Sequence, residues 1–450
     1  MKKLLKVIGL IAILLAVTVA GVLWYTNHYL QTPEFKSRML AAARASLGAE
    51  VKITEIDASL FKGITLKGVT IVNPPGFDGN LLTADEFVLR YDLLPLLRKQ
   101  VHIEQLSLTK PVITLVRNGK SGWSYEKLGA ATPSTPSPAV TLAPPTPSSA
   151  SSSLNIALSK LALTHGTVAM VGENNKVLVR VENINLDSAV NFAGGKLSGA
   201  GKVDIDTLNI ANSLFVRHLA APVGLTSDSV RLSPLSGKLT DGDVSGDLAL
   251  KVLGGTQYQL NLQVKNADVD KLMQEAGVAK RPLNGKLQAT AALAGTGGLP
   301  TIVGNGRAEI VGGELKNVPA LELVGALLQV PELSDLRFDQ CVLEFSLSNN
   351  VMQTPVVKLA SPEVQITGKG SVSLADYSLD YNLTLALAKD LLANMPKEVR
   401  AIFTERSDGF LTLDFRVWGP YDKPKTDLTK RLVKGVADQF LKQGIKKLFK

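Results

Sequence analysis

Few residues of this chain are spaced in a way that could support catalysis or metal binding. The four histidines, His28, His102, His165 and His218, stand far apart, with no second histidine three or four residues away and no HExxH motif. Because zinc sites take closely spaced ligands, no zinc site is expected. The single cysteine, Cys341, cannot form an internal disulfide, and its alternating surroundings predict a buried, unreactive thiol.

Motifs that bind phosphate or activate a nucleophile are incomplete. The segment from Asn118 to Ser121 ends like a phosphate-binding loop, but Thr114 stands where the first glycine belongs, so a hairpin turn is expected. Glu309 likewise replaces the third glycine of a dinucleotide fingerprint. The sequence holds no GxSxG motif, and acidic pairs such as Asp85-Glu86 are typical of turns and strand edges. We expect no enzyme, no metal and no cofactor.

The net positive charge of the chain comes from its two ends. The formal net charge of +9 comes from three lysines at the N-terminus and from an excess of six positive charges in the last 26 residues. The residues between them are neutral overall, so the composition does not indicate nucleic-acid binding.

The N-terminus has the features of a membrane anchor. Lysines precede an uncharged apolar run, Val7–Tyr25, whose nineteen residues would form a helix of about 28 Å, enough to span a bilayer. Aromatic residues at its far end favour the headgroup region, and the lysines mark the near end as cytoplasmic. A cleaved signal peptide is the alternative, but its apolar region is usually shorter and ends in an Ala-x-Ala-like site. A short amphipathic helix is expected to follow, from Thr32 to Gly48.

Beyond Gly48 the apolar residues repeat every second position, which is typical of antiparallel strands with one apolar face. Shorter runs of the same kind occur at Val112–Val116, Leu287–Leu293 and Leu343–Leu347. The strongest alternation gives these candidates for an apolar, lipid-binding groove: Tyr258, Leu260, Leu262 and Val264; Leu379, Tyr381, Leu383, Leu385 and Leu387; Leu411, Leu413, Phe415 and Val417.

Helices are expected at Asp268–Ala276, Ala320–Gln329 and Ala388–Thr404. Ala131–Ser153 holds six prolines, seven serines, four threonines and no charge, and is predicted to be an extended linker. The predicted organisation is an anchor over residues 1–30, a β region over 31–130, the linker over 131–153, a second β region over 154–424, and a basic amphipathic helix over 425–450.

The C-terminal helix could bind a membrane surface or pack on the protein's own sheet, and both alternatives stay open. The residues expected to contact a membrane at the two ends of the chain are Lys2, Lys3, Lys6, Trp24, Tyr25, Lys430, Lys434, Phe440, Lys442, Lys446 and Phe449.

The order of short motifs along the chain resembles the AsmA family. In the N-terminal part these are Leu47–Ile53, Gly63–Val69, Asn73–Gly76, Leu93–Leu97, Val101–Ile103, Lys110–Ile113, Asn118-Gly119 and Trp123. In the C-terminal part they are Gly304–Ala308, Gly313–Leu315, Leu359–Pro362, Gly368–Gly370 and Trp418–Pro420. The resemblance implies a mainly β protein in which an N-terminal transmembrane helix precedes a long, curved, mostly antiparallel sheet. That sheet would form a β-taco-like groove with few short helices.

The same resemblance implies a single-pass protein of the bacterial inner membrane, with a cytoplasmic N-terminus and most of the chain in the periplasm. The implied function is non-enzymatic phospholipid movement between inner and outer membranes, which supports outer-membrane homeostasis. An apolar trough would shield about 12 kcal/mol of a 16-carbon chain's exposure to water, at about 0.8 kcal/mol per methylene.

Two alternatives compete with a lipid groove. The apolar stripes could form the interior of an ordinary closed sandwich or barrel, filled by side chains. The protein could instead be a scaffold or assembly factor that binds envelope proteins by strand addition at an exposed sheet edge. Membrane phospholipid is the expected partner, envelope proteins are possible partners, and nucleic acid is not expected.

Overall fold

The structure is a computed structural model, and it describes residues 28–92, 101–119, 122–128, 156–193, 196–251, 257–296, 301–393, 395, 397–435 and 437. These residues fold mainly as strands with few helices, which confirms the predicted class. The chain divides into two compact units. The first unit comprises Met1–Asn212 and His218–Ser227, and the second comprises Ser213–Arg217 and Asp228–Lys450.

The helix predicted to follow the anchor is confirmed. Helix α2 (Pro33–Leu47) begins after Thr32, whose hydroxyl accepts a hydrogen bond from the amide of Phe35, and ends at Gly48 in the left-handed conformation. Among the residues that the structure describes, no helix has both the length and the apolar composition to cross a bilayer. The predicted span, Val7–Tyr25, and the predicted linker, Ala131–Ser153, lie outside those residues.

The first unit is a mixed sheet. Its other elements are β1 (Val51–Lys52), β2 (Glu55–Ser59), β3 (Gly63–Val72), β4 (Asn80–Asp92), β5 (Val101–Thr109), β6 (Val112–Asn118), β7 (Gly122–Trp123), η2 (Ser124–Lys127), β8 (Ile156–Val171), η3 (Glu173–Asn175), β9 (Val177–Ala193) and β10 (Lys196–Ile210). β1 and β2 both pair with β3, which pairs with β4, and β4 pairs with both β5 and β6. β8 runs parallel to β5 and β6, and β9 and β10 follow it antiparallel. The hairpin predicted at Asn118-Gly119 is confirmed by the pairing of β6 with β7.

Left-handed residues interrupt neighbouring strands of this sheet. Lys110, between β5 and β6, has a φ of 47°, His165 in β8 has 54°, and Asn183 in β9 has 55°. The amide of Lys110 donates to Thr164, and the amide of His165 donates to the side chain of Asn185, so the interruptions lie side by side. Because bulges of this kind bend a strand, their alignment curves the sheet.

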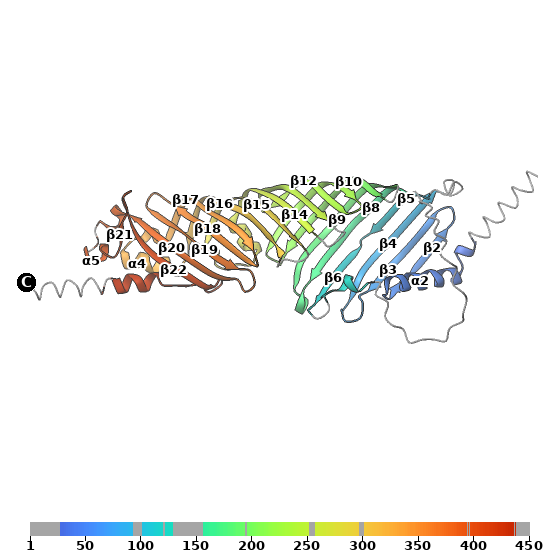
Figure 1. The fold of residues 1–450 in the computed structure, drawn as a ribbon, viewed down its shortest axis with the longest axis horizontal. Coiled ribbons are helices and arrows are strands. Elements are labelled where there is room, and N and C mark those ends of the chain that lie inside the picture. Colours follow the sequence, from blue (N-terminus) through green and yellow to red (C-terminus); the bar gives the residue numbers. More distant parts are fainter. Residues whose placement is uncertain are drawn as a thin grey trace, which may run out of the picture. The chain divides into compact units, whose positions relative to one another are not determined.

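The second unit is an antiparallel array. Its strands are β12 (Ser229–Leu239), β13 (Gly242–Lys251), β14 (Gln257–Asp268), β15 (Leu283–Thr296), β16 (Val303–Lys316), β17 (Asp335–Ser348), β18 (Val351–Ala360), β19 (Val364–Ser373), β20 (Ser378–Ala388), β21 (Thr404–Glu405), β22 (Phe410–Pro420) and β23 (Lys425–Thr426). From β12 to β20 each strand pairs with the next, and β20 pairs with β22 (Figure 1). The division between the units falls within β11 (Leu214–Thr226).

The alternating patterns predicted these strands correctly, and two of the three predicted helices are confirmed. They are α3 (Val269–Glu275) and α4 (Pro319–Leu328). The helix predicted over Ala388–Thr404 is wrong: the segment contains η6 (Lys389–Leu392), α5 (Lys397–Arg400) and the first residue of β21. Pro396 explains the break, because proline has no amide hydrogen and disfavours a helical residue before it.

Short helices cover one end of the second sheet and form its main core. Their buried leucines include Leu328 of α4, Leu333 of η5 (Pro331–Leu333) and Leu392 of η6, and they pack against Leu385 and Leu387 of β20. Burying each leucine stabilises the fold by about 1.5 to 3 kcal/mol. This cluster closes the apolar face over β20 and β22.

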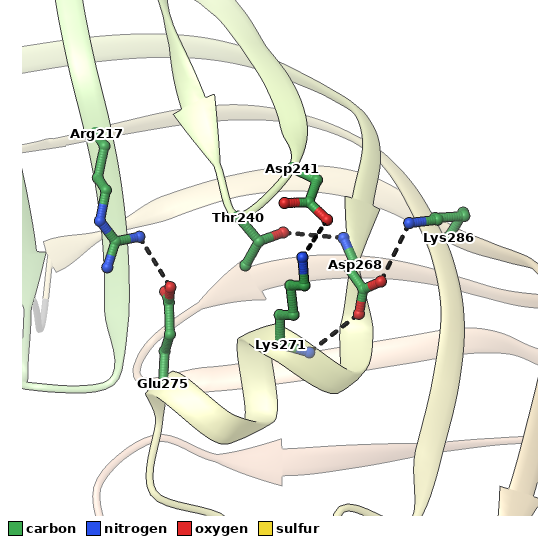
Figure 2. A network of polar contacts seen from close by, with 7 residues as sticks. All are labelled: Arg217, Thr240, Asp241, Asp268, Lys271, Glu275 and Lys286. Atoms are coloured by element: carbon green, nitrogen blue, oxygen red, sulfur yellow. Dashed lines mark hydrogen bonds and ion pairs between the residues drawn. The ribbon is translucent and has the colours of Figure 1, made fainter.

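A network of charged side chains fixes α3 in the second unit (Figure 2). Asp268 caps the helix by accepting a hydrogen bond from the amide of Lys271, and it pairs with Lys286 of β15 at 3.1 Å. Lys271 reaches Asp241 at 2.6 Å, and Arg217 of β11 reaches Glu275 at 2.9 Å. Burial opposes ionisation of Asp268, but the Lys271 amide and the Lys286 ammonium outweigh it, so the pKa of Asp268 is lowered. The helix is therefore held at both of its ends.

Candidate functional site

Three rows of apolar residues cross strands β13 to β17 of the second unit on one face of the sheet. Residues that pair directly across neighbouring strands share a face, so the register defines the rows. They are Leu248, Leu260, Leu293, Gly304 and Leu347; Gly246, Leu262, Ala291, Gly306 and Phe345; and Val244, Val264, Ala289, Ala308 and Leu343. We call these fifteen residues the apolar patch.

The opposite face of the same strands is mostly polar, with buried Val342 of β17 as an exception. Asp247, Asn261 and Asn305 alternate with the first row, and the amide of Asn261 donates to Asp247 at 2.9 Å. Arg307 and Glu344 form an ion pair across β16 and β17 at 2.6 Å. Water can form hydrogen bonds with the polar groups of this face. The apolar patch cannot form them and is stabilised by burial.

The patch is only half covered. Val244 is buried, but the other apolar side chains of β13 to β17 in the three rows are half-buried. A packed sandwich interior would bury such residues almost fully. Within the described residues, the closed-interior alternative fits the helix-covered end of this sheet better than it fits the patch.

Two glycines of β16 allow large side chains of neighbouring strands to pack closely over the patch. Gly304 and Gly306 point to the patch from β16, and the large side chains of Leu293 and Phe345 on neighbouring strands lie over them. A Cβ added at Gly306 would stand 2.4 Å from the ring of Phe345 and 2.5 Å from the carbonyl oxygen of Thr290. The Gly-x-Gly segment that resembles a nucleotide fingerprint is therefore a strand whose glycines admit neighbouring side chains.

Replacing Gly306 with valine is expected to destabilise the second unit by about 1 to 3 kcal/mol, because neither the ring nor the backbone oxygen has room for the new side chain. Denaturant unfolding measures the change. The matched control is Asn305→Val, which adds the same side chain on the polar face and is expected to change stability by about 0.5 kcal/mol or less. Equal effects of the two variants would show that the patch face of β16 is not tightly packed.

A hollow of about 630 Å³ lies at one end of the patch strands. Its lining includes Leu250 and Tyr258, which pair directly at the ends of β13 and β14, together with Lys251 and Thr301. Burial raises the pKa of the Tyr258 phenol, and a hydrogen bond with Thr301 opposes that rise. The apolar rows thus end at a hollow that is lined by both apolar and polar side chains.

The groove candidates predicted from the sequence fall into two environments. Tyr258, Leu260, Leu262 and Val264 are half-buried on the apolar face of β14. Leu385 and Leu387 of β20 and Leu411 and Phe415 of β22 are buried in the helix-covered core, and Leu383, Leu413 and Val417 pack against it. Leu379 and Tyr381 are half-buried at the other end of β20. The alternating sequence pattern predicted both the half-buried and the buried residues as groove residues. The pattern indicates which face of the sheet a residue occupies but not what covers that face.

The membrane-contact candidates are only partly described. Lys430 and Lys434 are exposed on a helix over residues 428–435, which we call the tail helix. Its Leu428 and Leu432 are buried in the core, so these turns pack on the protein's own sheet. Lys2, Lys3, Lys6, Trp24, Tyr25, Phe440, Lys442, Lys446 and Phe449 lie outside the described residues.

The first unit has apolar rows of its own. One row comprises Leu66, Phe87, Leu108, Leu163, Leu186 and Val203, which pair successively from β3 to β10. Val203 is buried and the others are half-buried. No residue of α2 is buried. Each unit therefore contains an apolar face that is incompletely covered within the described residues.

Sequence reasoning missed one arrangement of polar side chains in the first unit. His102 of β5 contacts Asp92 through Nδ1 at 2.5 Å and Ser159 of β8 through Nε2 at 2.8 Å. These are the partners of a serine, histidine and aspartate triad. Interaction with the Glu104 carboxyl, and then with the His102 ring, lowers the pKa of Asp92, and interaction with Asp92 raises the pKa of Glu104.

We expect a fluorophosphonate probe to leave Ser159 unlabelled, because its contact with His102 is exposed and water weakens the electrostatic activation that a nucleophilic serine needs. Intact-protein mass spectrometry after incubation measures the adduct, with a serine hydrolase labelled in parallel. Labelling that disappears in both Ser159→Ala and His102→Ala would contradict this expectation and identify a nucleophile.

The other residues that could react or bind a metal ion do not form a common site. Cys341 is half-buried in β17, and burial raises the pKa of its thiol to about 11, so the thiol stays protonated at neutral pH. Within the described part of the chain, no cluster of three or more His, Cys, Asp or Glu residues could hold a metal ion. A small polar cleft in the first unit, of about 240 Å³, is lined by Asn183, Asp204, Asp206 and His218.

Comparison with known proteins gives one match. A model described as the AsmA family matches residues 1–226, half of the 450-residue chain. The match covers the part of the chain in which the first group of sequence motifs lies, and the second group, beyond residue 300, falls outside it. No curated protein and no solved structure matches the chain.

Proposed function

Because the chain belongs to the AsmA family, we propose that it is a non-enzymatic envelope protein that binds phospholipid and supports phospholipid movement between inner and outer membranes. In this proposal the N-terminal segment anchors the protein in the inner membrane, and the two β units lie in the periplasm. The apolar run at Val7–Tyr25 and the lysines before it support the anchor.

The observation that carries the proposal is the half-covered apolar patch on β13 to β17. Three aligned apolar rows on one sheet face leave hydrocarbon surface in contact with water. An acyl chain lying across the rows would remove water from both surfaces at once. Each methylene transferred from water contributes about 0.8 kcal/mol, so a 16-carbon chain gains on the order of 12 kcal/mol at most.

The geometry fits an acyl chain in length. The β14 side chains from Tyr258 to Val264 extend over about 20 Å at roughly 3.4 Å per residue. One end of this stretch meets the hollow beside Lys251, and the other is followed by the buried residues Ala267 and Val269 beside α3. In this proposal the acyl chain lies on the patch and the polar head group stays near the hollow.

The helix-covered core defines where the binding surface stops. The third row of the patch continues from Leu343 through Val357, Gly368 and Leu383 to Phe415, and it becomes buried under the helices. The face over β20 and β22 is filled by the protein's own side chains, so we place lipid on β13 to β17 and not on β20 and β22.

The scaffold alternative requires an exposed strand edge, and the last strand of the second sheet is largely covered. β21 pairs with Leu411 and Thr412, and β23 pairs with Val417 and Trp418. Between them the side chain of Asp427 accepts a hydrogen bond from the amide of Arg416. Short flanking strands and charged side chains of this kind prevent edge-to-edge pairing, so strand addition at β22 is disfavoured.

Native mass spectrometry of the full-length protein, released from detergent micelles, tests the proposal. We expect adducts whose masses match phospholipids and whose acyl chains are confirmed by fragmentation. Protein that is folded and consistently free of phospholipid, but that co-purifies with envelope proteins, would contradict lipid binding and favour the scaffold alternative.

A further inference from the structure

A second surface of the second unit combines exposed aromatic rings with unpaired lysines. Tyr377 precedes β20 and Tyr421 follows β22, at strand ends that pair directly through Ser378 and Pro420. Tyr377 is 51% exposed and Tyr421 is 65% exposed, which makes them two of the most exposed large apolar residues described. With Lys423 and Lys425, they form what we call the Tyr–Lys surface.

The two tyrosines are held in place although they are exposed. Their rings meet edge to face with centroids 6.0 Å apart, and the amide of Tyr421 donates to the carbonyl oxygen of Tyr377 at 3.1 Å. Tyr377 has a φ of 56°, a left-handed conformation that is unfavourable for an aromatic residue. The turns therefore present both rings to the solvent at a fixed position, where they cover none of the protein's own core.

The lysines beside these rings differ from the lysines around α3 and β12. Lys238, Lys271 and Lys286 each pair with an aspartate. Within the part of the chain that the structure describes, Lys423 and Lys425 make no ion pair, although the hydrogen-bonded Asp376 and the exposed Asp422 lie in the same turns. The tail helix that follows adds further exposed lysines, Lys430 and Lys434, which also make no ion pair among these residues.

Asp427, the acidic residue closest to the tail helix, is already engaged. Its carboxylate accepts a hydrogen bond from the amide of Arg416 at 2.7 Å and pairs with Arg431 at 2.6 Å. Burial opposes its ionisation, but these partners outweigh burial, so the pKa of Asp427 is lowered and it stays charged at neutral pH. It pairs with Arg431 and makes no ion pair with Lys423 or Lys425.

We propose that the Tyr–Lys surface docks on the interface of a bilayer that contains anionic phospholipid. Tyrosine favours the headgroup region, where its ring contacts acyl chains and its hydroxyl stays hydrated. Unpaired lysines are attracted to anionic headgroups. The two amphipathic rings beside exposed lysine side chains fit a lipid surface better than a protein edge, because β23 already occupies the neighbouring edge of β22. The surface is separate from the apolar patch, and its docking does not depend on lipid occupying that patch.

Docking between two membranes tests this proposal with the full chain. The protein is reconstituted into vesicles through its N-terminal segment, and those vesicles are mixed with fluorescent vesicles of phosphatidylethanolamine and phosphatidylglycerol. Co-flotation measures docking. We expect docking to weaken as salt rises, and to be lost when the second vesicles contain only phosphatidylcholine.

Substitutions in the Tyr–Lys surface test whether this surface is responsible for docking. Lys423→Gln with Lys425→Gln is expected to weaken docking roughly tenfold and to reduce its salt dependence. Tyr377→Ala with Tyr421→Ala is expected to weaken it by a similar factor, and Tyr421→Trp is expected to retain it because tryptophan also favours the interface. The control, Tyr125→Ala with Lys67→Gln, removes an exposed tyrosine and a paired lysine of the first unit and is expected to leave docking unchanged.

Docking that survives both double variants would overturn the proposal, as would docking that requires protein in the second membrane. The lysine pair keeps the test decisive if the tyrosine pair proves unstable, because Lys423 and Lys425 are exposed and removing them leaves no buried group unpaired. Phospholipid bound on the patch is measured separately by native mass spectrometry, so a failure of docking and a failure of lipid binding are distinguishable.

Discussion

Leu262→Asp on the apolar patch is expected to reduce co-purifying phospholipid about 100-fold and to leave the protein folded. Leu262 lies in the middle row on β14, opposite Gly246 and Ala291, and it is half-buried. An aspartate there faces water in the empty protein but must lose its hydration when an acyl chain lies across it. Placing aspartate in hydrocarbon costs about 3 kcal/mol, which corresponds to roughly a 100-fold loss of affinity.

The matched control is Gln263→Asp, which adds the same charge to the next residue of the same strand. Gln263 lies on the polar face and is exposed, so this variant is expected to retain phospholipid. Lipid extraction followed by quantitative mass spectrometry compares the two variants, and circular dichroism confirms their folding. Equal lipid content in the two variants, both folded, would place the lipid elsewhere.

Leu385→Ala is expected to destabilise the second unit by about 3 to 4 kcal/mol. Leu385 is 0% exposed and packs in the helix-covered core with leucines of α4, η6 and the tail helix. Truncating a fully buried leucine loses its transfer free energy and leaves a cavity. The same truncation at half-buried Leu260 of the patch is expected to cost about 1 kcal/mol or less, because its side chain already contacts water.

Denaturant unfolding followed by the fluorescence of Trp418 measures this difference, with Trp24 and Trp123 replaced by phenylalanine. Trp418 belongs to β22, next to the core. The contrast between Leu385 and Leu260 distinguishes a filled core from an open face on one sheet. Comparable losses of stability at both positions would mean that the patch is as well packed as the core, and the lipid proposal would lose its basis.

The sequence was sufficient for the local elements. Alternation located β14, β20 and β22, and the Thr32 cap, the first-turn proline and Gly48 predicted α2 almost to the residue. These features depend on residues close together in the chain, so local pattern rules apply to them. The prediction of one helix over Ala388–Thr404 was wrong because it did not take into account Pro396, which interrupts a helix.

What covers each strand could not be predicted, because it depends on distant segments. Leu262 and Leu385 have the same alternating surroundings, yet Leu385 is buried by leucines from α4 and the tail helix, while Leu262 stays half-open. The contact between His102 and Ser159 was equally inaccessible, since it requires the parallel register of β5 and β8 across a long connection. The register between two parallel strands cannot be predicted from the sequence of either strand alone.

Site-specific photocrosslinking in living cells can show whether an acyl chain occupies the apolar patch. A benzophenone amino acid is placed at position 262 on the patch and, in a second strain, at position 263 on the polar face of the same strand. We expect a phospholipid adduct at position 262 and none at position 263. Adducts at both positions alike, or at neither while position 262 crosslinks to the protein's own chain, would contradict it.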